Sequence, residues 1–152
     1  MPVRQFVRGR ILFAQGRYED ARAAFEAAVA GGHGDRQALD ELHLSLGETL
    51  VRLERHAEAE EHFREELRAF PCRVRAYVSL AMLYHALDRP GAIDDVLEAL
   101  VDATRMAEGY DTAARLWTLF GERVRAAAVR ADARAWFRAE PSPVRLAQGA
   151  RR

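Results

Sequence analysis

Hydrophobic and small residues recur every three or four positions along most of the chain, which is the period of one helix face. The clearest stretch spans 42–71. Its apolar positions are Leu42, Leu46, Gly47, Leu50 and Leu53, followed by Ala59, Phe63, Leu67 and Phe70. This pattern predicts one helix from about 40 to 53, a turn at 54–56 and a second helix that stops before Pro71. The small residues Gly47 and Ala59 would let the two helices approach closely, with Phe63 in the seam.

The two-helix pattern occurs three more times. Turns are predicted at 15–17, 88–91 and 121–122, which leaves helix pairs over about 2–30, 73–101 and 110–139. The first helix of the chain is patterned by Val3, Phe6, Val7, Gly9, Leu12 and Phe13. Three glycines within 31–34 predict a flexible junction after the first pair. Pro141 and Pro143 predict that order ends before a flexible tail at 141–152.

The repeated pair resembles a tetratricopeptide repeat (TPR). The matching residues are Leu46, Gly47, Leu50, Ala59, Phe63, Leu67 and Pro71, and the run Gly16-x-Tyr18-x-x-Ala21-x-x-x-Phe25-x-x-Ala28 matches in the first pair. The resemblance implies an all-α fold, a right-handed superhelical solenoid of antiparallel helix pairs. It implies one domain over 1–140, with repeats at about 2–34, 40–72, 73–105 and 107–139. His43 departs from the pattern where Trp is usual, and Glu54 departs where Gly is usual.

Composition and charge indicate the kind of genome and the predicted location of the protein. The chain has 152 residues, no Lys and no Asn, and it is rich in Ala, a strong helix former. This usage is typical of a GC-rich genome, and we expect a bacterial protein. The net charge is zero, so no global field favours nucleic acid or membrane. No secretory signal and no membrane span is visible, which predicts a soluble, cytoplasmic protein without membrane contact.

The resemblance also implies a binding surface. In this family the first helices of successive repeats line a concave groove, so its residues can be assigned by position. They are Phe6, Arg10, Phe13, Leu44, Glu48, Arg52, Arg75, Val78, Met82, His85, Asp111 and Arg115, with Val3 and Glu41 in neighbouring positions. Apolar patches and both signs of charge suit an extended peptide or a helix of a partner protein. The chain is therefore predicted to be an interaction scaffold or adaptor.

One family subclass grips the C-terminal carboxylates of chaperones with Lys, Asn and Arg. Only Arg10 and Arg75 could do this work at the corresponding positions of this chain, so that clamp is disfavoured. An acidic peptide that contacts Arg10, Arg52 and Arg75 remains a possible ligand. The alternative is that these arginines are solvated charges on an unused face.

Side chains that could carry chemistry are sparse. Cys72 is the only cysteine. His56, Glu58 and His62 lie close in sequence but lack a second ligand cluster, so they are interpreted as exposed polar positions rather than a metal site. No catalytic motif is present, and adjacent acids such as Glu60 and Glu61 diverge around a helix. The sequence predicts no enzyme activity, no metal and no cofactor.

The C-terminal end supports an alternative function. Residues 115–152 hold nine Arg and three acidic residues, whereas residues 1–114 hold 14 Arg and 20 acidic residues. The alternative function is that of a regulatory protein that binds nucleic acid through this basic helix and its aromatic residues Trp136 and Phe137. Head-to-tail self-association of the basic end with the acidic body is a further possibility. The simplest interpretation is a solvated capping helix with Trp136 in the core.

Overall fold

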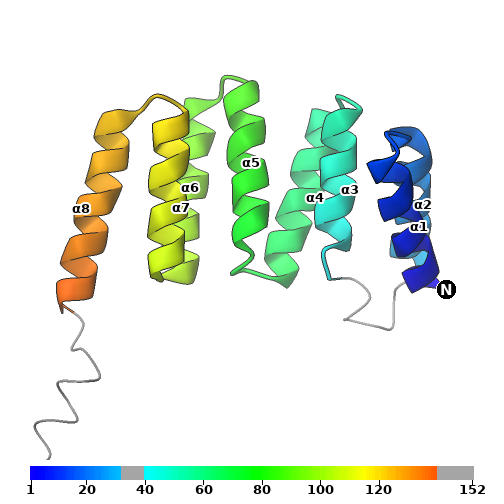
Figure 1. The fold of residues 1–152 in the computed structure, drawn as a ribbon, viewed down its shortest axis with the longest axis horizontal. Helices are drawn as coiled ribbons and strands as arrows, with labels where there is room; N and C mark the ends of the chain where they lie inside the picture. The colour runs from blue at the N-terminus through cyan, green and yellow to red at the C-terminus, as the bar shows by residue number, and fades with distance from the viewer. Residues whose placement is uncertain (32–39, 140–152) are drawn as a thin grey trace, which may run out of the picture. The chain divides into compact units, whose positions relative to one another are not determined.

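The computed structural model describes residues 1–31 and 40–139. This part of the chain is built of helices joined by short turns (Figure 1). They are α1 (Pro2–Ala14), α2 (Tyr18–Gly31), α3 (Leu42–Arg52), α4 (His56–Ala69), α5 (Val74–Ala86), α6 (Pro90–Thr104), α7 (Ala107–Leu119) and α8 (Arg123–Ala139). The predicted helix pairs are therefore confirmed. The predicted junction begins at Gly31, which the structure places at the end of α2, while the rest of that junction and the tail predicted at 141–152 lie outside the described residues.

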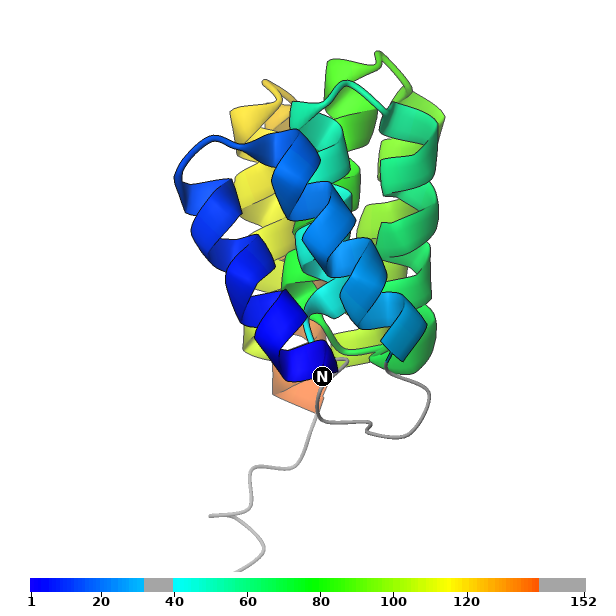
Figure 2. The ribbon, with the colours of Figure 1, turned by 90° about the vertical axis from the view of Figure 1, so that its right-hand side faces the viewer.

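The helices form two compact units, Met1–Ala103 and Thr104–Arg152. In the first unit α1 packs on α2, α2 packs on α3, α3 packs on α4, and α4 packs on α5. The helix α3 also touches both α1 and α5. Figure 2 shows α1 beside α2 at one edge of this unit. In the second unit α7 packs on α8. The first unit thus brings the first helices of three successive pairs together on one side.

The turn of each pair contains one residue in the left-handed backbone region. Gly16 has φ 75° and Gly121 has φ 85°, while Glu54 and Asp88 take φ 59° and 51° at the corresponding places. Glycine adopts this conformation without steric cost, and a side chain with a Cβ does not. The departure at Glu54 therefore leaves the turn unchanged in shape and places the strain on a non-glycine residue.

Glycine and phenylalanine form the closest seam within the first two pairs. A Cβ placed on Gly47 would lie 2.5 Å from the Phe63 ring, and one placed on Gly9 would lie 2.6 Å from the Phe25 ring. Both phenylalanines are 1% exposed. The predicted close approach at Gly47 is confirmed, and Gly9 repeats it one pair earlier. Each of these contacts joins the two helices of one pair, α1 with α2 and α3 with α4.

One predicted helix boundary differs from the structure. The helix predicted from about residue 40 begins at Leu42, because Glu41 has a left-handed φ of 62° and interrupts the helix. Val3 and Val7, two of the apolar residues that pattern the first helix, are 53% and 50% exposed. The buried positions of α1 are Gly9 and Leu12 instead. The apolar residues of α1 therefore fall on two opposite faces.

Candidate functional site

A hollow of about 180 Å³ lies beside α1, α3 and α5. Helical spacing explains how its residues converge, because positions three and four apart share one face of a helix. The lining residues are Arg10, Phe13 and Ala14 on α1, Phe25 on α2, Glu41 just before α3, Ser45 and Glu48 on α3, and Arg75 on α5. The hollow thus joins three successive helix pairs.

The hollow is lined by two arginines and two glutamates, and the two arginines differ in their pairing. Arg75 Nη2 lies 2.9 Å from Glu48 Oε1, an ion pair that crosses from α5 to α3. Arg10 lies 6.0 Å from the centroid of the Phe6 ring and forms no ion pair with a described acidic residue. The apolar part is aromatic: Phe25 is buried, and Phe13 packs edge-on against Tyr18 at 5.4 Å. The hollow can therefore accept an apolar side chain beside a cation that is open to an anionic group.

The structure places four of the twelve predicted groove residues in this hollow: Arg10, Phe13, Glu48 and Arg75. Phe6 lies beside it and packs on Phe25 with ring centroids 5.8 Å apart. The others that are not buried lie farther along the helices or in the second unit: Arg52 on α3, Val78, Met82 and His85 on α5, and Asp111 and Arg115 on α7. Asp111 and Arg115 form an ion pair of 2.7 Å within α7.

Leu44 was expected to line the groove, and this expectation is wrong. Its side chain is 1% exposed. Its backbone N–H donates to Glu66 Oε2 at 3.3 Å, which holds the first turn of α3 against α4. Leu44 is therefore a core residue. The position on α3 that faces the hollow is Ser45, its neighbour in sequence.

A buried carboxylate joins α3, α4 and α5, and the sequence pattern missed it. Glu66 is 0% exposed and lies 3.4 Å from Arg73 Nε. Arg73 also pairs with Asp40 and, at 3.6 Å, with Glu41, and it covers the Phe70 ring at 4.7 Å. The spacing from Ala59 and Phe63 to Glu66 is that of a buried face, so periodicity could have found this position if charged residues had been considered for it.

Burial raises the pKa of Glu66, and the positive charge of Arg73 opposes this shift only in part. Its Oε1 atom accepts no hydrogen bond within the described residues. A carboxylate in this situation is costly to keep charged. Its partners all belong to the helix junction, so we assign it to the stability of the fold rather than to the hollow.

His43 and His62 face each other between α3 and α4. Their Nδ1 atoms are 3.0 Å apart, and their rings are stacked with centroids at 5.3 Å. His62 was expected at an exposed position, and this is wrong because both rings are part-buried against each other. Burial lowers the pKa of both, and the charge of His62 lowers the pKa of His43 further. One neutral ring donates to the other, an arrangement that is lost when both rings are protonated.

This pair predicts a loss of stability in mild acid. The ordinary pKa of histidine is 6.5, and both folded values lie below it, so the unfolded chain takes up more protons as the pH falls through 6.5. The melting temperature should therefore drop from pH 7 to pH 5. His43→Phe removes one titrating ring and should reduce this drop. An equal drop in the wild type and His43→Phe would contradict the assignment.

The basic helix α8 engages the aromatic residues of the second unit. Arg125 lies over the Trp117 ring at 4.7 Å, and Arg105, which precedes α7, lies over the Trp136 ring at 5.2 Å. Phe137 packs edge-on against Tyr110 at 5.9 Å. Trp136 is partly rather than fully buried. These aromatic rings thus already have partners within their own unit.

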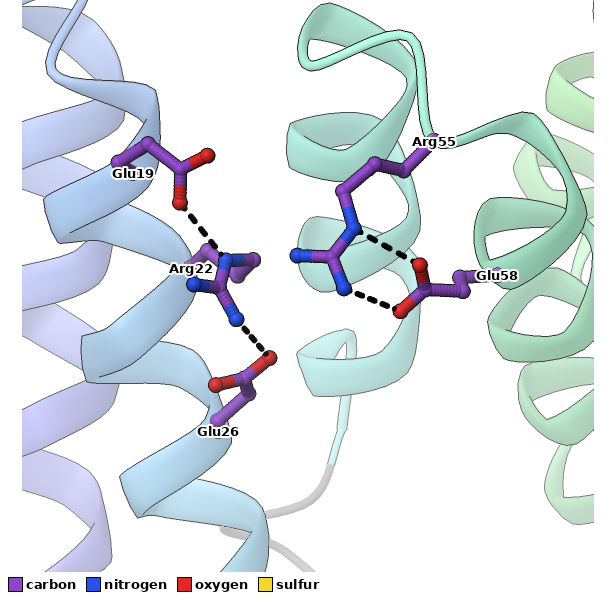
Figure 3. A network of polar contacts seen from close by, with 5 residues as sticks. All are labelled: Glu19, Arg22, Glu26, Arg55 and Glu58. Atoms are coloured by element: carbon purple, nitrogen blue, oxygen red, sulfur yellow. Dashed lines mark hydrogen bonds and ion pairs between the residues drawn. The ribbon is translucent and has the colours of Figure 1, made fainter.

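Arg22 on α2 and Arg55, which precedes α4, are neutralised locally. Figure 3 shows Arg22 between Glu19 and Glu26, and Arg55 held by both oxygens of Glu58. Over the ranges 1–31 and 40–139, no group of three or more His, Cys, Asp or Glu side chains could hold a metal ion. The described helices also include none that is long and apolar enough to cross a membrane.

Comparison with known proteins relates this geometry to a family. The family model of the tetratricopeptide repeat matches residues 6–71. A search of curated proteins finds no match. The crystal structure of a thermophilic TPR protein from Thermus thermophilus is similar with 26% identity and a TM-score of 0.63, over 90% of this chain and 74% of that one.

Two more distant structures share the fold alone. An Hsp90 co-chaperone, Cns1 from Saccharomyces cerevisiae, is 13% identical with a TM-score of 0.70, over 88% of this chain and 42% of that one. YrrB, described as a TPR protein with an unusual peptide-binding site, is 16% identical with a TM-score of 0.56, over 95% of this chain and 71% of that one. The predicted all-α class of TPR-type helix pairs is confirmed. Residues 6–71 belong to the tetratricopeptide repeat family, and the described helix pairs have the fold of that family.

Proposed function

We propose that this chain is an adaptor that holds a segment of a partner protein in the hollow of α1, α3 and α5. The TPR fold is in general a scaffold for protein–protein interaction, and YrrB is described by its peptide-binding site. The observation that carries the proposal is the hollow itself. It combines the aromatic residues Phe13 and Phe25 with the open cation Arg10.

The chemistry of the hollow defines the segment that fits. An apolar side chain would enter over Phe13, and a carboxylate on the same segment would pair with Arg10. Arg75 is held by Glu48, so a ligand that reaches it must either displace Glu48 or present a group that bridges both. This favours a peptide of mixed character with one acidic residue near its apolar anchor.

Arg10→Glu is expected to weaken capture of the partner by at least about tenfold, because it removes a charged hydrogen bond and places an anion where the partner carries one. Phe13→Ala should weaken capture as well by removing the apolar contact. The measurement is quantitative pull-down from the native lysate. Arg115→Glu is the matched control, since it reverses an exposed arginine on α7 outside the hollow.

A photo-crosslinking amino acid identifies the bound segment directly. Placed at Ser45, which lines the hollow, it should trap the same protein that Arg10→Glu loses. Placed at Arg115, it should not. Equal recovery of that protein by the wild type, Arg10→Glu and Phe13→Ala would refute the hollow as the binding site.

A further inference from the structure

The outer face of α1 carries an apolar stripe that the described residues of the first unit leave exposed. Val3, Val7 and Ile11 are 53%, 50% and 53% exposed. At about 100° per residue these three positions span about 80° of the helix circumference, opposite the buried Gly9 and Leu12. Together with Arg4, Arg8 and Leu12 they surround a shallow depression of about 420 Å³. We call Val3, Val7 and Ile11 the outer stripe.

Charge around the outer stripe has one sign. The helix α1 carries Arg4, Arg8 and Arg10 and no acidic residue. Neither Arg4 nor Arg8 forms an ion pair with any acidic side chain of the described residues, in contrast to Arg22 on α2 and Arg55 beside α4 (Figure 3). On the helix circumference Arg4 and Arg8 lie on one flank of the stripe and Arg10 on the other. An apolar ridge between cations is therefore open to solvent.

We propose that the outer stripe docks an acidic amphipathic helix of a partner protein. Side chains spaced by four residues form a ridge that packs into the groove of a second helix, and the stripe is about 12 Å long, the length of roughly two helical turns. Apolar residues of the partner would cover Val3, Val7 and Ile11. Its Glu or Asp residues on both flanks would pair with Arg4, Arg8 and Arg10. Val3, Val7 and Ile11 do not line the hollow, and among the described residues Arg10 is the one that borders both surfaces.

A second copy of the chain matches the charge of the outer stripe less well than an acidic partner helix does. Two α1 helices would set arginines against arginines, which opposes docking. The acid-rich helices are α4 and α6, but neither bears one of the large exposed apolar side chains of the described residues. Arg-rich α8 repels α1 for the same reason as α1 itself. None of α4, α6 and α8 therefore offers acidic and apolar groups together to match the stripe.

Two helical peptides of about 18 residues test the proposal, a length at which isolated helices become stable enough to use. Both carry Leu at positions i, i+4 and i+8, flanked by Glu in one peptide and by Lys in the other. Fluorescence anisotropy with the full chain gives each Kd. We expect the Glu peptide to bind the wild type at least about tenfold more tightly than the Lys peptide. Equal affinity, or no binding of the Glu peptide, would overturn the proposal.

Variants separate the stripe from other surfaces. Val7→Asp should weaken binding of the Glu peptide by at least about tenfold in Kd. The double variant with Arg4→Glu and Arg8→Glu should bind the Lys peptide more tightly than the Glu peptide. Both changes are at exposed positions, and circular dichroism checks that the helices persist. Arg75→Glu, which changes a residue of the hollow, should bind the Glu peptide like the wild type. The experiment therefore separates binding at the hollow from binding at the outer stripe.

Analytical ultracentrifugation tests the competing occupant. A wild-type dimer that Val7→Asp converts to a monomer would show that a second copy covers the stripe, and this would overturn the proposal of a partner helix. A wild type that sediments as the same species as Val7→Asp, together with tight binding of the Glu peptide, supports it. If Val7→Asp perturbs the fold, the double variant with Arg4→Glu and Arg8→Glu still tests the proposal, because its relative affinity for the two peptides is measured separately.

Discussion

Phe63→Ala is expected to lower the free energy of unfolding by about 3–5 kcal/mol, the usual cost of removing a buried phenylalanine. The Phe63 ring is 1% exposed and lies against the backbone of Gly47. The surrounding helix backbones cannot collapse into the space that the ring leaves, so a cavity adds to the lost burial. Chemical denaturation followed by circular dichroism measures the change.

The opposite side of the same seam supplies a reciprocal test. Gly47→Ala would place a methyl group 2.5 Å from the Phe63 ring. The shift that relieves this overlap should lower the free energy of unfolding by about 1–3 kcal/mol. Phe63→Leu makes room for that methyl group, so the double variant should be more stable than the sum of the two single changes predicts. Additive effects would show that the two residues do not share one seam.

Gly91→Ala is the matched control for the glycine change. Gly91 lies in the first turn of α6, and a Cβ there has no heavy atom within 4 Å. This change should be neutral or stabilising by up to about 1 kcal/mol, because alanine is the better helix former. A loss at Gly91 as large as that at Gly47 would show that contact with Phe63 is not the cause of the loss at Gly47.

Arg73→Ala is expected to destabilise the protein by about 3–5 kcal/mol near neutral pH, because it leaves the buried Glu66 without its cation. It also removes the contacts of Arg73 to Asp40, Glu41 and the Phe70 ring. Arg75→Ala is the control. Its pair with Glu48 is half exposed, so its loss should be no more than about 1 kcal/mol.

The pH dependence identifies Glu66 as the cause. Its folded pKa lies above the ordinary value of 4.5, so between these two values the native state binds more protons than the unfolded chain and stability falls as the pH rises. Glu66→Gln abolishes this fall and keeps an oxygen for the Leu44 N–H. It should also recover part of the stability lost in Arg73→Ala. If Glu66→Gln leaves the pH profile unchanged, Glu66 is not the titrating group.

The candidate site was partly predictable from the sequence. Arg10, Phe13, Glu48 and Arg75 were assigned by their places in a repeat, and all four line the hollow. Positions in a repeat are counted along each helix separately, so the resemblance assigns residues within one helix at a time. The assignment failed at Leu44, because a shift of one residue turns a side chain by about 100° and moves it from the hollow into the core.

Local signals in the sequence alone determined the helix pairs, their turns and the glycine seam. Periodicity and turn residues act over a few positions, and Gly47 with Phe63 needs only a close pair of neighbouring helices. Tertiary structure alone decided which long-range side chains meet. The contacts of Glu66 with Arg73, His43 with His62, and Arg75 with Glu48 depend on how each helix is rotated against the next.

The helix α1 shows the physical reason most clearly. Its apolar residues satisfy helical spacing on two opposite faces, so the pattern predicts a helix but cannot say which face enters the core. Packing against α2 buries Gly9 and Leu12 and leaves Val3, Val7 and Ile11 exposed between arginines. The sequence therefore specified an amphipathic repeat, and the packed helices decided which of its surfaces are free to bind.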